Sequence, residues 1–174
     1  MTRKRSREGG SSERRFPVEP PFVVNGWKIY VWSEFAERWR ALRQAVEVLR
    51  RNDPLGWVHH PEARFLEALR RVVLEQIPSD PGSERYRQGL TLGKEHRHWR
   101  RAKFLRRFRL FFRYHSENKI IIYAWLNDED SLREAGARTD VYRVFDGMLR
   151  RGTPPSDWDA LLTECEAWRQ RDAG

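Results

Sequence analysis

Apolar and polar side chains alternate along three segments between residues 98 and 127, with the period of two that is typical of β-strands. The segments span residues 98–104, 107–114 and 119–127. Residues 116–118 have the length of a hairpin turn, and Arg106 and Arg107 are candidates for a second tight turn. Three consecutive strands with such short links predict an antiparallel sheet, so the chain must fold around one.

Because successive side chains of a strand point to opposite faces, the alternation predicts two different faces for this sheet. One face is apolar and comprises Ala102, Phe104, Phe108, Leu110, Phe112, Ile120, Ile122, Ala124 and Leu126. The other interleaves cations with aromatic rings and comprises Trp99, Arg101, Lys103, Arg107, Arg109, Phe111, Arg113, Tyr123 and Trp125. We expect helices to cover the first face. The second should be exposed, where rings stack on unpaired bases and cations bind phosphates.

Basic residues are concentrated in the same part of the chain. Nine Lys or Arg residues lie between Lys94 and Arg113 beside a single acid, Glu95, and the whole chain has a formal net charge of +9 at pH 7. Such a surface favours a polyanionic partner, above all RNA or another ligand that carries phosphate. The alternative is the solvated face of an ordinary basic protein.

Amphipathic helical patterns flank the strands. A strand at about residues 27–32 precedes a helix of about 18 residues with Ser33 as its N-cap, and Pro61 begins a second helix. The segment 86–92 is a candidate for one more short strand, Thr139 and Asp140 cap a third helix, and a fourth follows residues 154–156. The order predicts an α+β fold with its helices on one sheet face.

The domain organisation is simple. Residues 22–174 are expected to form a single domain, and residues 1–21 a disordered basic tail with six Lys or Arg among the first fifteen positions. The tail is either a solubilising extension or an auxiliary RNA-binding arm. The longest apolar run, IIIYAWL, is far shorter than the ~20 residues of a membrane helix. We therefore expect a cytoplasmic protein without membrane contact.

Few residues suit metal or nucleophilic chemistry. His96 and His98 can contact phosphate, transfer protons or simply lie at the surface, and Glu95 is the only nearby acid that could complete a metal site. The run Asn-Asp-Glu-Asp at 127–130 can hold a divalent metal, include a general base or form a polar turn. Cys165, the single cysteine, excludes an internal disulfide and is expected to be inert packing. We expect neither a metal nor a cofactor.

Seven segments in this order resemble one known family. They are NGWKIYV from Asn25, YRQGLTLG from Tyr86, HWRRAKF, RFRLFFRY, WLNDED, ARTDVYRVFDGMLRRG and PPSDWDALL. Together they are similar to the YhaV toxins of bacterial type II toxin–antitoxin modules, over roughly residues 25–162. The tail lies outside the resemblance.

The resemblance implies a RelE-like fold, with a helical hairpin, an antiparallel sheet and C-terminal helices. It also implies an endoribonuclease, or mRNA interferase, that cuts mRNA in association with translating ribosomes and so inhibits translation and growth. A PrlF-type antitoxin of the AbrB-like class would neutralise it, and the complex would bind its own promoter DNA.

Matching the family's motifs to this chain assigns catalytic roles to Arg101, Lys103, Arg109 and Tyr142. The residues expected to contact RNA are His96, His98, Arg107, Arg113, Tyr123, Trp125 and Arg138. We expect metal-independent attack by the RNA's own 2′-hydroxyl, with the cations stabilising the phosphorane. Tyr142, His98 and Glu129 remain open as proton-transfer groups. The competing hypotheses are a basic RNA-binding protein without catalysis and a metal-dependent nuclease that uses Asp128 and Glu129.

Overall fold

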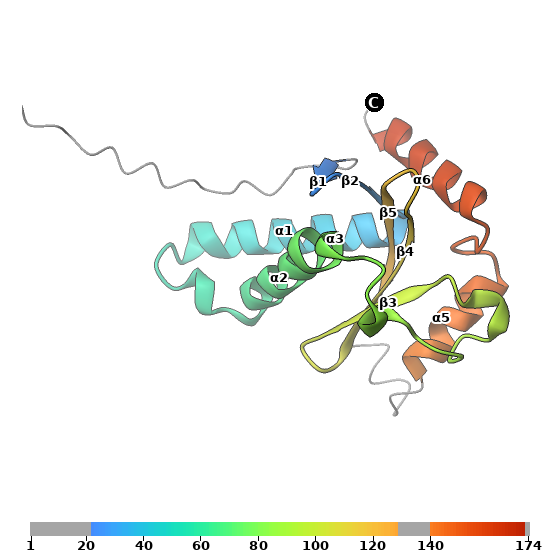
Figure 1. Ribbon diagram of the computed structural model, residues 1–174. Helices are drawn as coiled ribbons and strands as arrows, with labels where there is room; N and C mark the ends of the chain where they lie inside the picture. Colours follow the sequence, from blue (N-terminus) through green and yellow to red (C-terminus); the bar gives the residue numbers. More distant parts are fainter. Residues whose placement is uncertain (1–21, 129–139, 173–174) are drawn as a thin grey trace, which may run out of the picture.

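A computed structural model describes residues 22–128 and 140–172 of the chain (Figure 1). The strands are β1 (Phe22–Val24), β2 (Trp27–Val31), β3 (Arg100–Phe104), β4 (Phe108–His115) and β5 (Ile120–Leu126). The longer helices are α1 (Ser33–Asn52), α2 (Pro61–Arg71), α5 (Asp140–Arg150) and α6 (Trp158–Asp172). Short helical turns are η1 (Trp57–His59), η2 (Val72–Gln76), α3 (Ile77–Ser79), η3 (Glu84–Tyr86) and η4 (Lys94–His96). The tail of residues 1–21 lies outside the described residues.

The five strands form one sheet in the order β1-β2-β5-β4-β3. The antiparallel run predicted from the alternation is confirmed for β3, β4 and β5, whereas β2 pairs with β5 in parallel. The strand expected at residues 86–92 is wrong, because that segment forms η3, turns and a single bridge between Arg87 and Arg100. Gly89 within the segment and Gly93 directly after it have φ of 67° and 86°, which interrupts an extended backbone.

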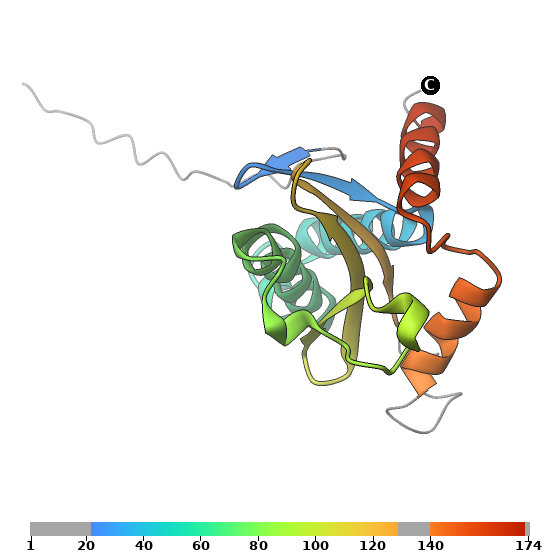
Figure 2. The same cartoon turned by 45° about the vertical axis from the view of Figure 1, so that its right-hand side comes forward.

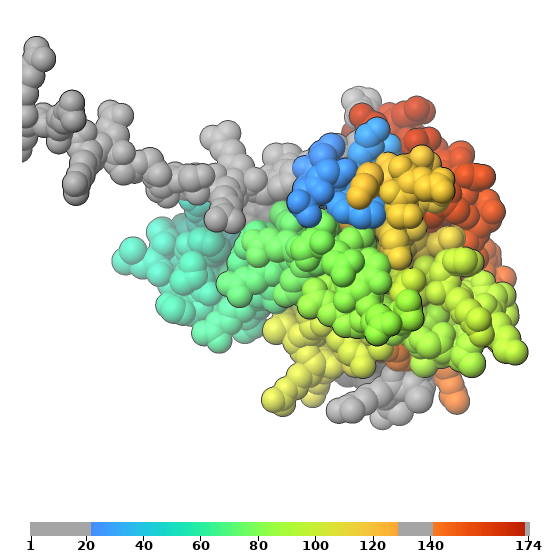
Figure 3. All heavy atoms as spheres, in the orientation of Figure 1, coloured from blue at the N-terminus to red at the C-terminus, as the bar shows by residue number. Residues whose placement is uncertain are grey.

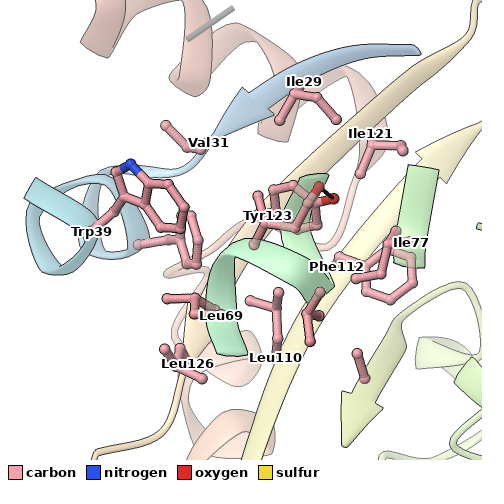
Figure 4. Close-up of a cluster of buried hydrophobic side chains, with 14 of the residues drawn as sticks. Ile29, Val31, Trp39, Leu69, Ile77, Leu110, Phe112, Ile121, Tyr123 and Leu126 are labelled. Carbon is pink, nitrogen blue, oxygen red and sulfur yellow. Dashed lines mark hydrogen bonds between the residues drawn. The ribbon is translucent and has the colours of Figure 1, made fainter. Parts of the chain in front are cut away.

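Helices cover both faces of the sheet, so the expectation of helices on one face only is wrong (Figure 2). The first core packs α1, α2 and η2 against residues such as Ile29, Leu110 and Tyr123 (Figure 4). The second core packs α5 and α6 against the opposite face, where Phe111 is fully buried. Every residue of β5 is buried as a result. The C-terminal helices thus occupy much of the face that the sequence indicated as exposed.

An irregularity in β5 explains part of the difference between the expected and the observed faces of this strand. Phe111 pairs with Trp125 but Phe112 pairs with Tyr123, so Ala124 is an extra residue in β5. Such a bulge reverses the alternation beyond it. Ile120, Ile122 and Ala124 therefore pack in the second core and Tyr123 in the first, opposite to the faces expected from strict alternation. Trp125 and Leu126 lie on the expected faces.

The helix boundaries follow local chemistry with one exception. Pro61 is the first residue of α2, as predicted. Ser33 is not the N-cap of α1, because Trp32 occupies that position without a side-chain cap. The Trp32 Nε1–H instead donates to Glu164 Oε2 of α6 at 2.9 Å. The tertiary contact of the indole outweighs the capping preference of the serine that follows it.

Candidate active site

Lys103 and Arg109 lie directly opposite each other on the adjacent strands β3 and β4. Arg101 is two residues from Lys103 on the same face, roughly 7 Å away along the strand, and is paired with Phe111. We call these three cations, together with Tyr142 of α5, the cationic strip. The sequence placed the three cations on one face correctly, because β3 and β4 keep strict alternation as far as Phe111.

Helix α5 brings Tyr142 to the same place. The Arg101 Nε–H donates to the Tyr142 hydroxyl at 2.9 Å, and the Tyr142 ring packs edge-on against Phe111 with centroids 5.8 Å apart. Tyr142 is half-buried, so its ring is fixed while its hydroxyl lies at the strip. The fold thus joins two predicted catalytic residues that are 41 positions apart in the sequence.

Arg101 has a second anchor that the sequence did not indicate. Its Nη1–H donates to the Arg85 carbonyl at 3.0 Å. The Arg85 guanidinium in turn lies over the ring of Tyr86, 4.7 Å from the centroid. Two hydrogen bonds to fixed partners hold the Arg101 guanidinium in one orientation, which is what a preorganised donor to a developing charge requires.

Asn127 fixes the backbone around Arg109. Its side chain is fully buried; Oδ1 accepts from the Arg109 backbone N–H at 2.7 Å and Nδ2 donates to the Arg107 carbonyl at 3.0 Å. Arg109 Nη1 adds bonds to the carbonyls of Arg106 and Phe108, at 3.0 and 2.9 Å. For the run at residues 127–130, the sequence left a metal site, a general base and a polar turn open, and within it Asn127 has a structural role. An amide that directly follows an all-apolar strand was the sequence signal for such a role.

The cations of the strip are not neutralised within the described protein. Over residues 22–128 and 140–172, the ion pairs involve other arginines and His60, and none joins Arg101, Lys103 or Arg109 to a carboxylate. Lys103 is exposed and directly faces a like charge, an arrangement that costs stability in a sheet. An anionic ligand would relieve this repulsion, so the strip is suited to bind phosphate.

Arg113 has a structural position rather than the RNA-binding one expected. Its Nη1 donates to the Ser156 carbonyl, and its guanidinium lies over Trp99 and Trp158, 5.7 and 5.5 Å from the ring centroids. Burial lowers the pKa of this arginine. It is enclosed because the segment between α5 and α6 crosses β4 at this point.

His96 contacts the same segment. Its Nδ1 lies 2.9 Å from Ser156 Oγ, and Trp99 Nε1–H donates to that oxygen at 3.2 Å. These contacts give His96 a structural partner in the segment between α5 and α6. His98 and Arg107 are exposed, and Arg138 lies outside the described residues.

The two rings expected to stack on bases are buried, so that prediction is wrong. Tyr123 is wholly inaccessible and donates its hydroxyl proton to the Val73 carbonyl at 2.6 Å, and burial raises its pKa well above the usual range. Trp125 stacks on Phe145 with centroids 5.7 Å apart and planes 7° from parallel. The first ring belongs to the core beneath α1 and the second to the core beneath α5.

The other residues considered for nucleophilic or metal chemistry are not part of the cationic strip. Cys165 is buried in the second core, and burial raises the pKa of its thiol to about 12. Within the described ranges, no group of three or more His, Cys, Asp or Glu side chains is arranged to hold a metal ion. Glu129 and Asp130 lie outside those ranges. No helix in the described part of the chain has both the length and the apolar character that crossing a membrane requires.

Comparison with known proteins identifies close relatives. A family of toxins with endonuclease activity, of toxin–antitoxin systems, matches residues 29–166. Toxin YhaV of Escherichia coli O6:H1 and ribonuclease toxin YhaV of Escherichia coli K12 are each 42% identical over 148 residues, which is 84% of this chain and 96% of the relative. No solved structure matches the chain.

Proposed function

Since the chain belongs to the YhaV family of ribonuclease toxins, we propose that it cleaves mRNA by attack of the RNA's own 2′-hydroxyl, with the cationic strip as its active site. The family and its toxin activity agree with the sequence resemblance, and the α+β fold fits the RelE-like architecture that it implied. The observation that carries the proposal is the strip itself. Three cations share one face of the sheet and one of them, Arg101, contacts a tyrosine hydroxyl, without a carboxylate of the described residues pairing with them.

Cleavage of this kind has three requirements. The 2′-oxygen must lose a proton, the pentavalent phosphorane must be stabilised, and the 5′-oxygen must gain a proton as it leaves. Arg101, Lys103 and Arg109 supply fixed donors for the charge on the phosphorane. Arg101 and Arg109 are held by backbone carbonyls, so little reorganisation is needed when that charge develops.

Tyr142 is the best-placed described group to protonate the leaving oxygen. Its oxygen accepts the Arg101 Nε–H, so its own hydroxyl proton remains available for donation. Such general acid catalysis contributes typically 10²–10⁴-fold. Alignment of the 2′-oxygen with the scissile phosphate would come from the strip together with the ribosome that presents the mRNA.

Partners follow from the same surface. A toxin of a toxin–antitoxin system has an antitoxin partner, and we propose one of PrlF type with an acidic segment that covers residues 94–113. Masking the strip would prevent RNA binding and so neutralise the toxin. The complex would bind promoter DNA through the AbrB-like part of the antitoxin, and the toxin would act in the cytoplasm, where mRNA is translated.

The decisive experiment removes the nucleophile from the substrate. The toxin is incubated, with ribosomes if they prove necessary, with mRNA that carries a single 2′-deoxy substitution at the cut site. We expect that bond to resist cleavage, and the unmodified RNA to yield a 2′,3′-cyclic phosphate and a 5′-hydroxyl. In the ribosome-free assay, cleavage should persist in excess EDTA. Cleavage of the deoxy bond at the normal rate would refute the mechanism and favour Asp128 and Glu129 as metal ligands.

Variants then assign the residues. Arg101→Ala and Arg109→Ala should each lower the cleavage rate about 10²–10³-fold, the usual cost of one electrostatic donor. Arg64→Ala is the matched control, because it removes an exposed arginine from α2 on the other side of the sheet. In cells, Arg109→Ala should relieve growth arrest while the protein stays folded. A folded Arg109 variant that remains fully toxic would exclude this residue from the active site.

A further inference from the structure

The link between β3 and β4 has an unusual backbone. Leu105 and Arg106 are consecutive residues with φ of 46° and 63°. Positive φ at two successive positions is normally provided by Asn-Gly or Asp-Gly, because a bulky side chain is strained there. A leucine followed by an arginine is therefore an unfavourable choice for this turn, which suggests a selected role for their side chains.

The tip is exposed although one of its side chains is apolar. Leu105 is 52% exposed, and Arg106 and Arg107 beside it are exposed as well. In the space-filling view the hairpin projects from the body of the protein (yellow, lower left in Figure 3). The tip continues the strand pair that carries Lys103 and Arg109, two to three residues beyond them.

The projecting hairpin is supported on its α2 side and at its base. On the α2 side, the ring of Phe65 packs against Phe104 and Phe108, with centroids 5.7 and 4.6 Å apart. At its base, Asn127 binds the backbone at Arg107 and Arg109, and the Arg107 N–H donates to the Leu105 carbonyl at 2.7 Å. Leu105 is thus held out from the surface by a fixed scaffold, which lowers the entropy cost of inserting it into a ligand.

We propose that Leu105 and Arg106 form an RNA-binding tip, in which the leucine wedges against the bases of the strand and the arginine binds a phosphate. This inference rests on the proposed RNA substrate and extends its binding site beyond the cationic strip. Apolar side chains on rigid elements insert between bases in other nucleic-acid complexes, usually with flanking cations on the phosphates. The neighbouring charges suit the polyanionic backbone of RNA, because the tip and the strand pair below it carry Lys103, Arg106, Arg107 and Arg109 without an acid between them.

The test measures RNA binding separately from cleavage. The probe is a fluorescein-labelled, fully 2′-O-methylated RNA oligonucleotide of mixed sequence, titrated with the full-length toxin over a range of salt concentrations. Because this probe lacks the 2′-hydroxyl, its affinity does not depend on the cleavage mechanism. Failure of the proposed chemistry and failure of the tip are therefore distinguishable.

Substitutions of the two side chains are expected to change RNA affinity and its salt dependence differently. Leu105→Asn should weaken binding about fivefold, because the apolar contact of leucine with the bases is lost, with an unchanged salt dependence. Arg106→Gly should weaken binding and make the slope of log K against log salt less negative by about 0.7, the value for one phosphate contact on a single strand. Both variants should raise the thermal midpoint, because asparagine and glycine tolerate positive φ.

Leu55→Asn is the matched control, since Leu55 is a 94% exposed leucine in the link between α1 and α2. It should bind the probe as the native toxin does. Native RNA affinity in both tip variants would overturn the proposal. Native RNA affinity in Leu105→Asn, combined with lost neutralisation by the cognate antitoxin, would overturn it in favour of a protein contact.

Discussion

Replacing Asn127 by alanine tests whether one buried amide organises the proposed active site. The substitution removes the acceptor of the Arg109 N–H and the donor to the Arg107 carbonyl, at 2.7 and 3.0 Å. It leaves every proposed catalytic side chain in place. Asn127 itself is fully buried, so water reaches the vacated positions poorly.

The expected cost follows from these two bonds. Each contributes about 1 kcal/mol net, and a buried partner left unsatisfied costs about 1–3 kcal/mol. Because the two backbone groups are only partly buried, we expect a total near 3 kcal/mol. Even at the lower end of the usual stability of about 5–15 kcal/mol, about 2 kcal/mol would remain, so the variant should still fold.

Urea unfolding measures the loss of stability, and a cleavage assay on the folded variant measures the loss of function. We expect the cleavage rate to fall because Arg109 is no longer fixed, while RNA affinity changes little since no charge is lost. Asn118→Ala, in the exposed link between β4 and β5, is the control and should change neither quantity. A native urea midpoint together with native cleavage in Asn127→Ala would show that this amide does not position Arg109.

Four further predictions follow from the contacts. Arg113→Met should destabilise the fold by about 1–3 kcal/mol yet leave the salt dependence of RNA binding unchanged, which a titration in salt checks. Tyr142→Phe should keep RNA affinity and lower single-turnover cleavage by about 10²-fold or more; an unchanged rate would remove it as the general acid. Trp125→Ala should cost about 3–5 kcal/mol in urea unfolding, since its ring stacks in the core. Hydrogen bonds from Arg70 lower the pKa of Glu67, so the charged carboxylate stabilises the fold at pH values above its unfolded pKa, near 4.3, and this stabilisation is lost as the pH falls further. Glu67→Gln should therefore make the thermal midpoint depend less on pH below about 4.3, which thermal melts at a series of pH values measure.

The sequence predicted the strands and the cations of the strip well because β3 and β4 alternate without interruption. Arg101, Lys103 and Arg109 therefore lie on one face, as expected. It did not predict that Ala124 is an extra residue in β5. A bulge has no signal in an all-apolar strand such as IIIYAWL, where either face accepts every side chain.

The burial of the second face also had no local signal. Phe111 and Trp99 were compatible both with base stacking and with packing against helices. The choice depended on where α5 and α6 would dock, which is a property of the whole chain. The same holds for Arg113, whose charge indicated RNA but whose partner is a carbonyl 43 residues away.

The parallel pairing of β2 with β5 has a consequence for how the toxin is made. It joins residues 28–31 to residues 120–123, so the sheet stays incomplete until the ribosome has synthesised β5. Contacts this distant in sequence form late in folding, because a long loop must close first. Tyr142 then comes from a still later segment. A nascent chain therefore cannot bring Tyr142 to the cationic strip until most of it has been translated.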